Sequence, residues 1–282
     1  MKVLVTGGSG YLGIHVRRFF DADDFSRRVG LDILDPYDAS RVADYDTVIH
    51  LAAHLDKSRE AAAACFRTNA EGTANLLTHM REGATFIYAS TKDVYGSHAD
   101  GYTEVPESCA TDYCGQSPLE WSKLMGERYV EYYAAARGLR ACIFRLSAVY
   151  ARPSEGNESN FVAHYVEAVK RGWPLSLPGG GQPLRDLLHV EDFSRACHAF
   201  MDSGLARGTY NLGGGREQAT TLGGIVETVG RLIQLDPVIA ADAAASAPAP
   251  VPFNYVSDLS LVRAELGWEP LIGIEAGLQS LL

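Results

Sequence analysis

The segment TGGSGYLG at residues 6–13 restricts the possible folds of this chain more than any other feature. It follows the β-branched run KVLV and precedes a helical pattern that begins near Tyr11, so it joins a strand to a helix. The spacing of Gly7, Gly10 and Gly13 allows a tight turn and brings backbone N–H groups against a pyrophosphate at the helix N-terminus. The segment therefore predicts a dinucleotide-binding unit.

Runs of β-branched residues alternate with helical patterns through the first half of the chain. Strands are expected in KVLVTG, RRVGLDI, TVIHLAA, ATFIYAS and RACIFRLSAVY, and helices in 11–20, 57–80 and 119–137. This alternation predicts an α/β fold with a Rossmann-type, doubly wound parallel sheet that helices cover on both faces. The less regular second half suggests a helix at 191–203, a strand at 208–212, a last helix near 222–234 and a loop at 240–252.

The formal net charge of −10 argues against nucleic acid or an anionic membrane as a partner. No apolar run reaches the roughly 18 residues that a membrane-spanning helix needs. The five cysteines include no Cys-x-x-Cys pair, and the N-terminus enters a strand at once. We therefore expect a cytoplasmic protein with reduced thiols.

Asp32 is the candidate for recognition of the adenosine ribose. It lies about 20 residues after Gly13, at the end of the predicted strand RRVGLDI, where an acid can accept hydrogen bonds from ribose hydroxyls. A carboxylate there favours NAD, because it would repel the 2′-phosphate of NADP. Arg27 and Arg28 lie nearby in the sequence, so NADP remains a possible cofactor.

Small and polar residues follow two of the predicted buried strands. Ala52 and Ala53 would let a cofactor approach the backbone, whereas His50 and His54 lack a third ligand at a plausible spacing, so no metal is expected. Ligands of doubly wound sheets bind at the carboxyl ends of the strands. The candidates for substrate chemistry after the strand ATFIYAS are Ser90, Thr91, Lys92 and Asp93.

Nine segments follow one another in the order known from a single enzyme family. They are TGGSGYLG, VIHLAA, NAEGTANLL (69–77), STKDVYG, SKLMGE, FRLSAVYARP (144–153), PLRDLLHVED (183–192), TYNLGGG (209–215) and LGWEP (266–270). With them the chain resembles an extended short-chain dehydrogenase/reductase of the NAD-dependent sugar-nucleotide epimerase/dehydratase family, to which UDP-glucose 4-epimerase belongs.

The resemblance implies a Rossmann domain at residues 1–150, to which part of 186–215 returns, and a smaller α/β substrate-binding domain at 151–282. It implies NAD as cofactor, with NADP possible, a nucleotide-sugar-like substrate, and a homodimer that forms through the helix containing 119–137. The cofactor-site residues expected on this basis are Gly7, Gly10, Tyr11, Leu12, Gly13, Asp32, Ile33, Leu51, Ala52, Ala53, Asn69, Ser90 and Lys123.

The family resemblance also implies roles for single side chains. Thr91 would hydrogen-bond the reacting hydroxyl, Lys123 would hold the nicotinamide ribose, and Asn69 would brace the site. Arg185 would meet the diphosphate of the sugar nucleotide, with Lys92 in the same substrate region.

Leu119 is the largest departure from the family's pattern. The family has a tyrosine four residues before the lysine, on the same helix face, and its phenolate takes a proton from a sugar hydroxyl. Leucine cannot take a proton, and loss of a positioned base costs roughly 10²–10⁴-fold in rate. Candidates for a replacement base are Tyr113, Asp93, Lys92 and Lys123.

Three further differences alter the expected site. Asp93 stands where the family's dehydratases have a second acid, and Lys92 replaces the first, which favours proton-transfer chemistry over simple hydride exchange. Ala148 replaces an asparagine that contacts the sugar nucleotide in many relatives. Only 36–44 separates DILD from the next strand, so the adenine half of the site is expected to be abbreviated, with Asp32 as either the ribose acid or the adenine contact.

Two functions are consistent with these features. One is an NAD(P)-dependent epimerase or dehydratase with an atypical base, and the other is an inactive nucleotide-binding relative with a regulatory or scaffold role. A third explanation is that Leu119 was introduced by mutagenesis, which the native gene sequence would decide.

Overall fold

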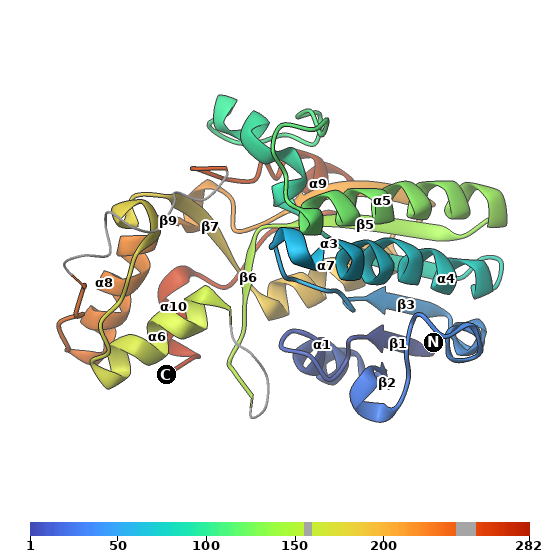
Figure 1. Ribbon diagram of the computed structural model, residues 1–282, viewed down its shortest axis with the longest axis horizontal. Coiled ribbons are helices and arrows are strands. Elements are labelled where there is room, and N and C mark those ends of the chain that lie inside the picture. The colour runs from blue at the N-terminus through green and yellow to red at the C-terminus, as the bar shows by residue number, and fades with distance from the viewer. Residues whose placement is uncertain (155–159, 241–251) are drawn as a thin grey trace.

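The structure is a computed structural model that describes residues 1–154, 160–240 and 252–282. Most of the predicted loop at 240–252 lies outside these residues. The larger sheet of the structure is parallel and six-stranded, with the order β2-β1-β3-β4-β5-β8 (Figure 1). The strands are β1 (Val3–Thr6), β2 (Asp23–Phe25), β3 (Thr47–His50), β4 (Thr85–Thr91), β5 (Arg140–Leu146) and β8 (Arg207–Leu212).

Helices cover both faces of this sheet, as the apolar strands require. On one face, Val16, Phe193 and Val262 of α1, α7 and α9 pack on β-strand residues; on the other, Leu76 and Val130 of α4 and α5 do so. The helices are α1 (Gly13–Phe20), α4 (Gly72–His79), α5 (Pro118–Arg137), α7 (Val190–Asp202) and α9 (Ser260–Leu266), with the short α2 (Pro36–Ala39) and α3 (Ala62–Cys65) between β2 and α4. The predicted doubly wound α/β fold is confirmed.

A second, three-stranded sheet has the order β6-β7-β9 and packs with helices of the C-terminal half (Figure 1). Its elements are β6 (Ala148–Tyr150), β7 (Leu184–His189), β9 (Ala219–Thr221), α6 (Phe161–Arg171), α8 (Leu222–Ile233) and α10 (Ile274–Gln279). The domain boundary at residue 150 stays a prediction. Within the described ranges, no helix is long and apolar enough to cross a membrane.

Three predicted elements differ from the structure. The run RRVGLDI is not a strand: β2 ends at Phe25, and a 3-10 helix at Arg27–Val29 is terminated by Gly30, whose φ is +80°. Asp32 therefore does not end a strand. RACIFRLSAVY divides into β5 and β6, which belong to different sheets, and α8 is followed by α9 and α10 rather than ending the helical part of the chain.

The helix α5 begins where local sequence dictates. Pro118 occupies its first turn, where a missing N–H costs nothing, and the Glu120 carboxylate accepts a hydrogen bond from the Ser117 backbone N–H at 2.7 Å. Gly138 ends the helix with a φ of +64°. This start places Leu119 and Lys123 one turn apart, beside the carboxyl end of β4.

Candidate active site

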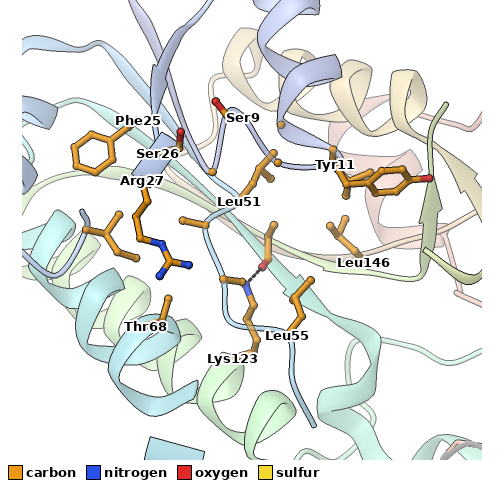
Figure 2. Close-up of a pocket in the computed structure, with 18 of the residues that line it drawn as sticks. Ser9, Tyr11, Phe25, Ser26, Arg27, Leu51, Leu55, Thr68, Lys123 and Leu146 are labelled. Carbon is orange, nitrogen blue, oxygen red and sulfur yellow. Dashed lines mark hydrogen bonds between the residues drawn. The ribbon is translucent and has the colours of Figure 1, made fainter. Parts of the chain in front are cut away.

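A cavity of about 540 Å³ opens where the glycine-rich turn meets the carboxyl ends of β1, β3 and β4 (Figure 2). The turn has the close packing that a dinucleotide-binding turn requires, and a side chain at Gly7 or Gly13 would not fit. A Cβ on Gly13 would lie 2.1 Å from the Gly7 carbonyl oxygen, and a Cβ on Gly7 would lie 2.9 Å from the Ala52 nitrogen. The turn is thus as tight as the glycine spacing predicted, and Gly7, Gly10 and Gly13 line the cavity at the start of α1.

The predicted cofactor residues line this cavity, with one exception. Asn69 is fully buried behind it, where its amide donates to the His54 carbonyl and to Ser122 Oγ, both at 2.9 Å. This position agrees with a bracing residue rather than a direct contact. The lining residues among the predicted set are Gly7, Gly10, Tyr11, Leu12, Gly13, Asp32, Ile33, Leu51, Ala52, Ala53, Ser90 and Lys123.

Lys123 reaches the cavity from α5. Its Nζ donates to the Ala89 carbonyl at 2.8 Å and lies 5.0 Å from the centre of the Tyr88 ring (Figure 2). Burial lowers the pKa of this amine to about 8, although the Glu127 carboxylate acts in the opposite direction. Near neutral pH, a larger fraction of Lys123 is therefore the neutral amine than for an exposed lysine.

Leu119 lies in the wall of the same cavity and is 8% exposed. It forms a small apolar cluster with the buried residues Ala61 and Cys65. The position at which the family has its tyrosine is therefore directed at the cofactor cavity, one turn before Lys123, and it carries no polar atom.

A second cavity, of about 560 Å³, adjoins the first one on the side of β6, α6 and β7. Thr91, Leu146 and Ser147 line both cavities, so the two meet at the ends of β4 and β5. The Thr91 hydroxyl oxygen accepts the Asp93 backbone N–H at 3.2 Å, which leaves its O–H able to donate into the junction. Ala148 also lines the second cavity, with only a methyl group.

Charged side chains crowd one wall of the second cavity. Lys57 Nζ lies 3.0 Å from Asp93 Oδ2 and 2.7 Å from Glu120 Oε1, and Lys92 forms an ion pair with Asp93. Burial alone would raise the pKa of the Asp93 carboxyl, but the ammonium groups of Lys92 and Lys57 outweigh it and hold that pKa well below its ordinary value.

Lys92 and Arg185 add positive charge at the same cavity. Burial lowers the pKa of Lys92, the Asp93 carboxylate opposes this, and the nearby Arg185 and Lys57 lower it further. The Arg185 guanidinium donates to backbone carbonyls of Leu184 at 2.6 Å, Phe253 at 2.8 Å and Pro252 at 2.9 Å. These bonds fix the group in place and leave Nε–H and one Nη2–H for an anion.

Tyr113 is not brought to either cavity. Its side chain is 68% exposed, and its ring packs edge-on against Trp121 at 5.6 Å between centroids. Tyr113 is not one of the described residues that line the two cavities. Nothing in the geometry supports its predicted role as a base.

Several lining residues carried no signal in the sequence. Lys57 and Glu120 come from unrelated segments, and only the fold joins them to Asp93. Ser26 follows β2 directly, a position that could be recognised only once that strand was placed correctly. Further lining residues without a recognisable motif are Leu55, Thr68 and Asn160 in the first cavity and Gln116, Phe161 and Tyr165 in the second.

A model described as the NAD dependent epimerase/dehydratase family matches residues 3–213, most of the chain. The chain belongs to this family. The match confirms the resemblance drawn from the nine motifs, and the family's dependence on NAD agrees with the predicted cofactor. Membership does not bear on Leu119, for which the consequences are chemical.

Relatives with assigned activities cover nearly the whole chain. The dTDP-glucose 4,6-dehydratase of Neisseria meningitidis is 29% identical over 99% of this chain and 91% of its own length, and that of Neisseria gonorrhoeae is 30% identical over 99% and 93%. Among solved structures, the UDP-glucose 4-epimerase of Thermotoga maritima, with UDP-glucose, superposes with a TM-score of 0.84 at 26% identity over 100% of this chain and 97% of that chain. Family members thus include both dehydratases and epimerases.

Proposed function

We propose that this protein is an NAD(P)-dependent enzyme of the epimerase or dehydratase type that acts on a nucleotide sugar. The observation that carries the proposal is the junction of the two cavities at Thr91. The first cavity has the glycine turn that a dinucleotide requires, and the second has fixed cations for a diphosphate. A sugar hydroxyl bound at Thr91 would lie at the boundary between the two.

Lys123 is the proposed proton acceptor in place of the missing tyrosine. When bound in the first cavity, the nicotinamide cofactor would supply hydride acceptance and return. Lys123 lines the same cavity as the proposed cofactor site. Its lowered pKa provides a neutral amine near pH 8. Asp93 is a weaker candidate because two ammonium groups lower the pKa of its carboxyl, which makes the carboxylate a poor proton acceptor.

A panel of UDP-, dTDP- and GDP-sugars, each incubated with the protein and NAD or NADP, tests the proposal. At least one sugar is expected to give a new product by chromatography, with or without a net absorbance change at 340 nm. Substitution T91A should reduce that activity, whereas T91S, which keeps the hydroxyl, should retain most of it. Absence of product from every sugar would contradict the proposed activity.

The pH dependence of kcat/KM tests the role of Lys123. The neutral amine is the reactive form, so activity is expected to rise as the pH passes through about 8 and to level off above it. K123R keeps the positive charge, but arginine stays protonated at this pH and cannot accept a proton. It should therefore lower activity by roughly 10²–10⁴-fold and remove the rising limb of the pH profile. K170R, at an exposed lysine paired with Glu167 outside both cavities, should leave the limb unchanged. A rising limb that persists in K123R would exclude Lys123 as the base.

Leu119 favours a second candidate, an inactive relative that binds nucleotide and serves as a regulator or scaffold. The wall of the first cavity is apolar at Leu119, the position of the family's base. Tight cofactor binding without turnover on any sugar, unaffected by T91A, would support this alternative over the enzyme.

We also propose a homodimer that forms through α5 and a cytoplasmic location. The exposed side chains Met125 and Tyr132 on α5, at 39% and 64% exposure, support a packing surface there. The five free cysteines support a reducing compartment.

A further inference from the structure

We propose that the first cavity contains a subsite for the 2′-phosphate of NADP(H), formed by Ser26, Arg27 and Arg28, and that the protein prefers NADP(H) to NAD(H). The inference rests on the proposed dinucleotide site and deepens it. It reverses the preference for NAD that the sequence position of Asp32 suggested.

The register of the sheet places Ser26 where the adenosine ribose is recognised. Phe25, the last residue of β2, pairs with Thr6, the last residue of β1. The Gly7 N–H donates to the Phe25 carbonyl at 2.8 Å, so the glycine turn and the end of β2 lie side by side. In dinucleotide-binding folds, the residue that follows this strand selects between a 2′-hydroxyl and a 2′-phosphate.

The group at this position is a hydroxyl with no partner. Ser26 lines the cavity, and its Oγ is buried without a hydrogen bond to any described residue. A buried hydroxyl that lacks a partner is costly, and a phosphate oxygen would satisfy it. Rotation of the Ser26 side chain toward the cavity that it lines would give this Oγ a phosphate oxygen as its partner.

Two arginines follow Ser26 directly in the chain. Arg27 and Arg28 both line the cavity, and the Arg27 side chain extends from the end of β2 into it, toward Thr68 on the other side (Figure 2). The Arg27 guanidinium makes no hydrogen bond or ion pair with any other residue that the structure describes. Arg28 donates from Nη1 to the Ser9 carbonyl at 3.1 Å, which holds it against the glycine turn. Arginine binds phosphate through paired N–H donors.

The acids nearby do not oppose a phosphate at Ser26. Asp24 precedes Phe25, but its carboxylate forms a hydrogen bond with Ser9 and an ion pair with Arg17 at 3.1 Å, and it does not line the cavity. Asp32 lies beyond the 3-10 helix, and its Oδ1 accepts the Leu34 N–H at 2.9 Å within a local turn. Asp32 therefore suits the adenine side of the cavity, where the shortening of the chain falls.

Direct binding of the reduced cofactors tests the preference. Quenching of protein fluorescence should give a Kd for NADPH at least about tenfold lower than for NADH, since each hydrogen bond to a charged group contributes a factor of that order. The fragment 2′,5′-ADP should bind more tightly than 5′-AMP by a similar factor. R27A and R28A should each weaken NADPH and 2′,5′-ADP about tenfold and leave NADH within about twofold.

Two further variants sharpen the test. R18A removes an exposed arginine of α1 that does not line the cavity, so it should change neither cofactor's Kd. S26D places a carboxylate directly after β2 and should reverse the preference toward NADH. Equal Kd values for NADH and NADPH, or equal losses of both in R27A, would overturn the subsite and leave the dinucleotide site intact. Failure of the protein to bind either cofactor would overturn both the subsite and the proposed function.

Discussion

The L119Y variant is expected to convert its nucleotide sugar about 10²-fold faster than the unchanged chain. A tyrosine at this position would stand one helical turn before Lys123, on the same face of α5. The Lys123 ammonium would lower the pKa of the phenol, and the phenolate would take the proton of the sugar hydroxyl at the Thr91 junction. The expected gain lies at the lower end of the range for a positioned base, because Lys123 already supplies part of that function.

The cavity wall makes this substitution structurally reasonable. Leu119 borders an open space of about 540 Å³, so there is room in the cavity for an aromatic ring at this position. L119F is the matched control, since it adds the same ring without the hydroxyl. Single-turnover formation of reduced cofactor at 340 nm measures the step directly. If L119F accelerates it as much as L119Y, then the gain comes from packing, and the missing base does not limit the reaction.

The parts of the site that sequence predicted well are those coded by local backbone requirements. Gly7 and Gly13 are needed because a Cβ at either would meet backbone atoms, so their spacing reports the turn directly. The start of α5 follows likewise from Pro118 and Glu120. These local rules place Lys123 on α5, whereas its assignment to the cofactor site came from the family resemblance of the segment SKLMGE.

The predicted strand RRVGLDI was wrong because the true strand, β2, is short and lacks a clear pattern. β2 contains only Asp23, Asp24 and Phe25, and its pairing with β1 outweighs the low strand propensity of aspartate. The β-branched run after it is broken by Gly30 and never pairs. Because the strand was predicted too late in the chain, Asp32 was considered for the ribose and Ser26 was not.

The charged wall of the second cavity could not be predicted for a different reason. Lys57 and Glu120 are far apart in sequence, and each looks like an ordinary surface residue. They meet because Glu120, at the first turn of α5, is buried by the chain that leaves β3, and its carboxylate then needs a cation. Contacts between distant segments of this kind leave no periodic or local trace in the sequence.

The R145M variant is expected to lose about 3–5 kcal/mol of unfolding free energy, because it breaks a buried ion pair. Arg145 Nη2 lies 2.7 Å from Glu127 Oε2, Nε lies 3.1 Å from Oε1, and both side chains are buried. Ser90 Oγ donates to Glu127 Oε1 at 2.5 Å, and Arg145 Nη1 donates to the Tyr95 hydroxyl at 3.0 Å. Methionine would fill much of the space but leave the Glu127 carboxylate uncompensated in the interior.

Urea denaturation of R145M and two comparison variants isolates the origin of this loss. R128M breaks an exposed pair with Glu131 on the same helix and should cost at most about 1 kcal/mol. The double variant E127M/R145M removes both charges, so it should recover most of the stability that R145M loses. If the double variant is less stable than R145M, then the apolar pair cannot replace the packing of the two side chains, and the loss is not the cost of one unpaired charge. Because Ser90 lines the cofactor cavity, R145M should also weaken cofactor binding, whereas R128M should not.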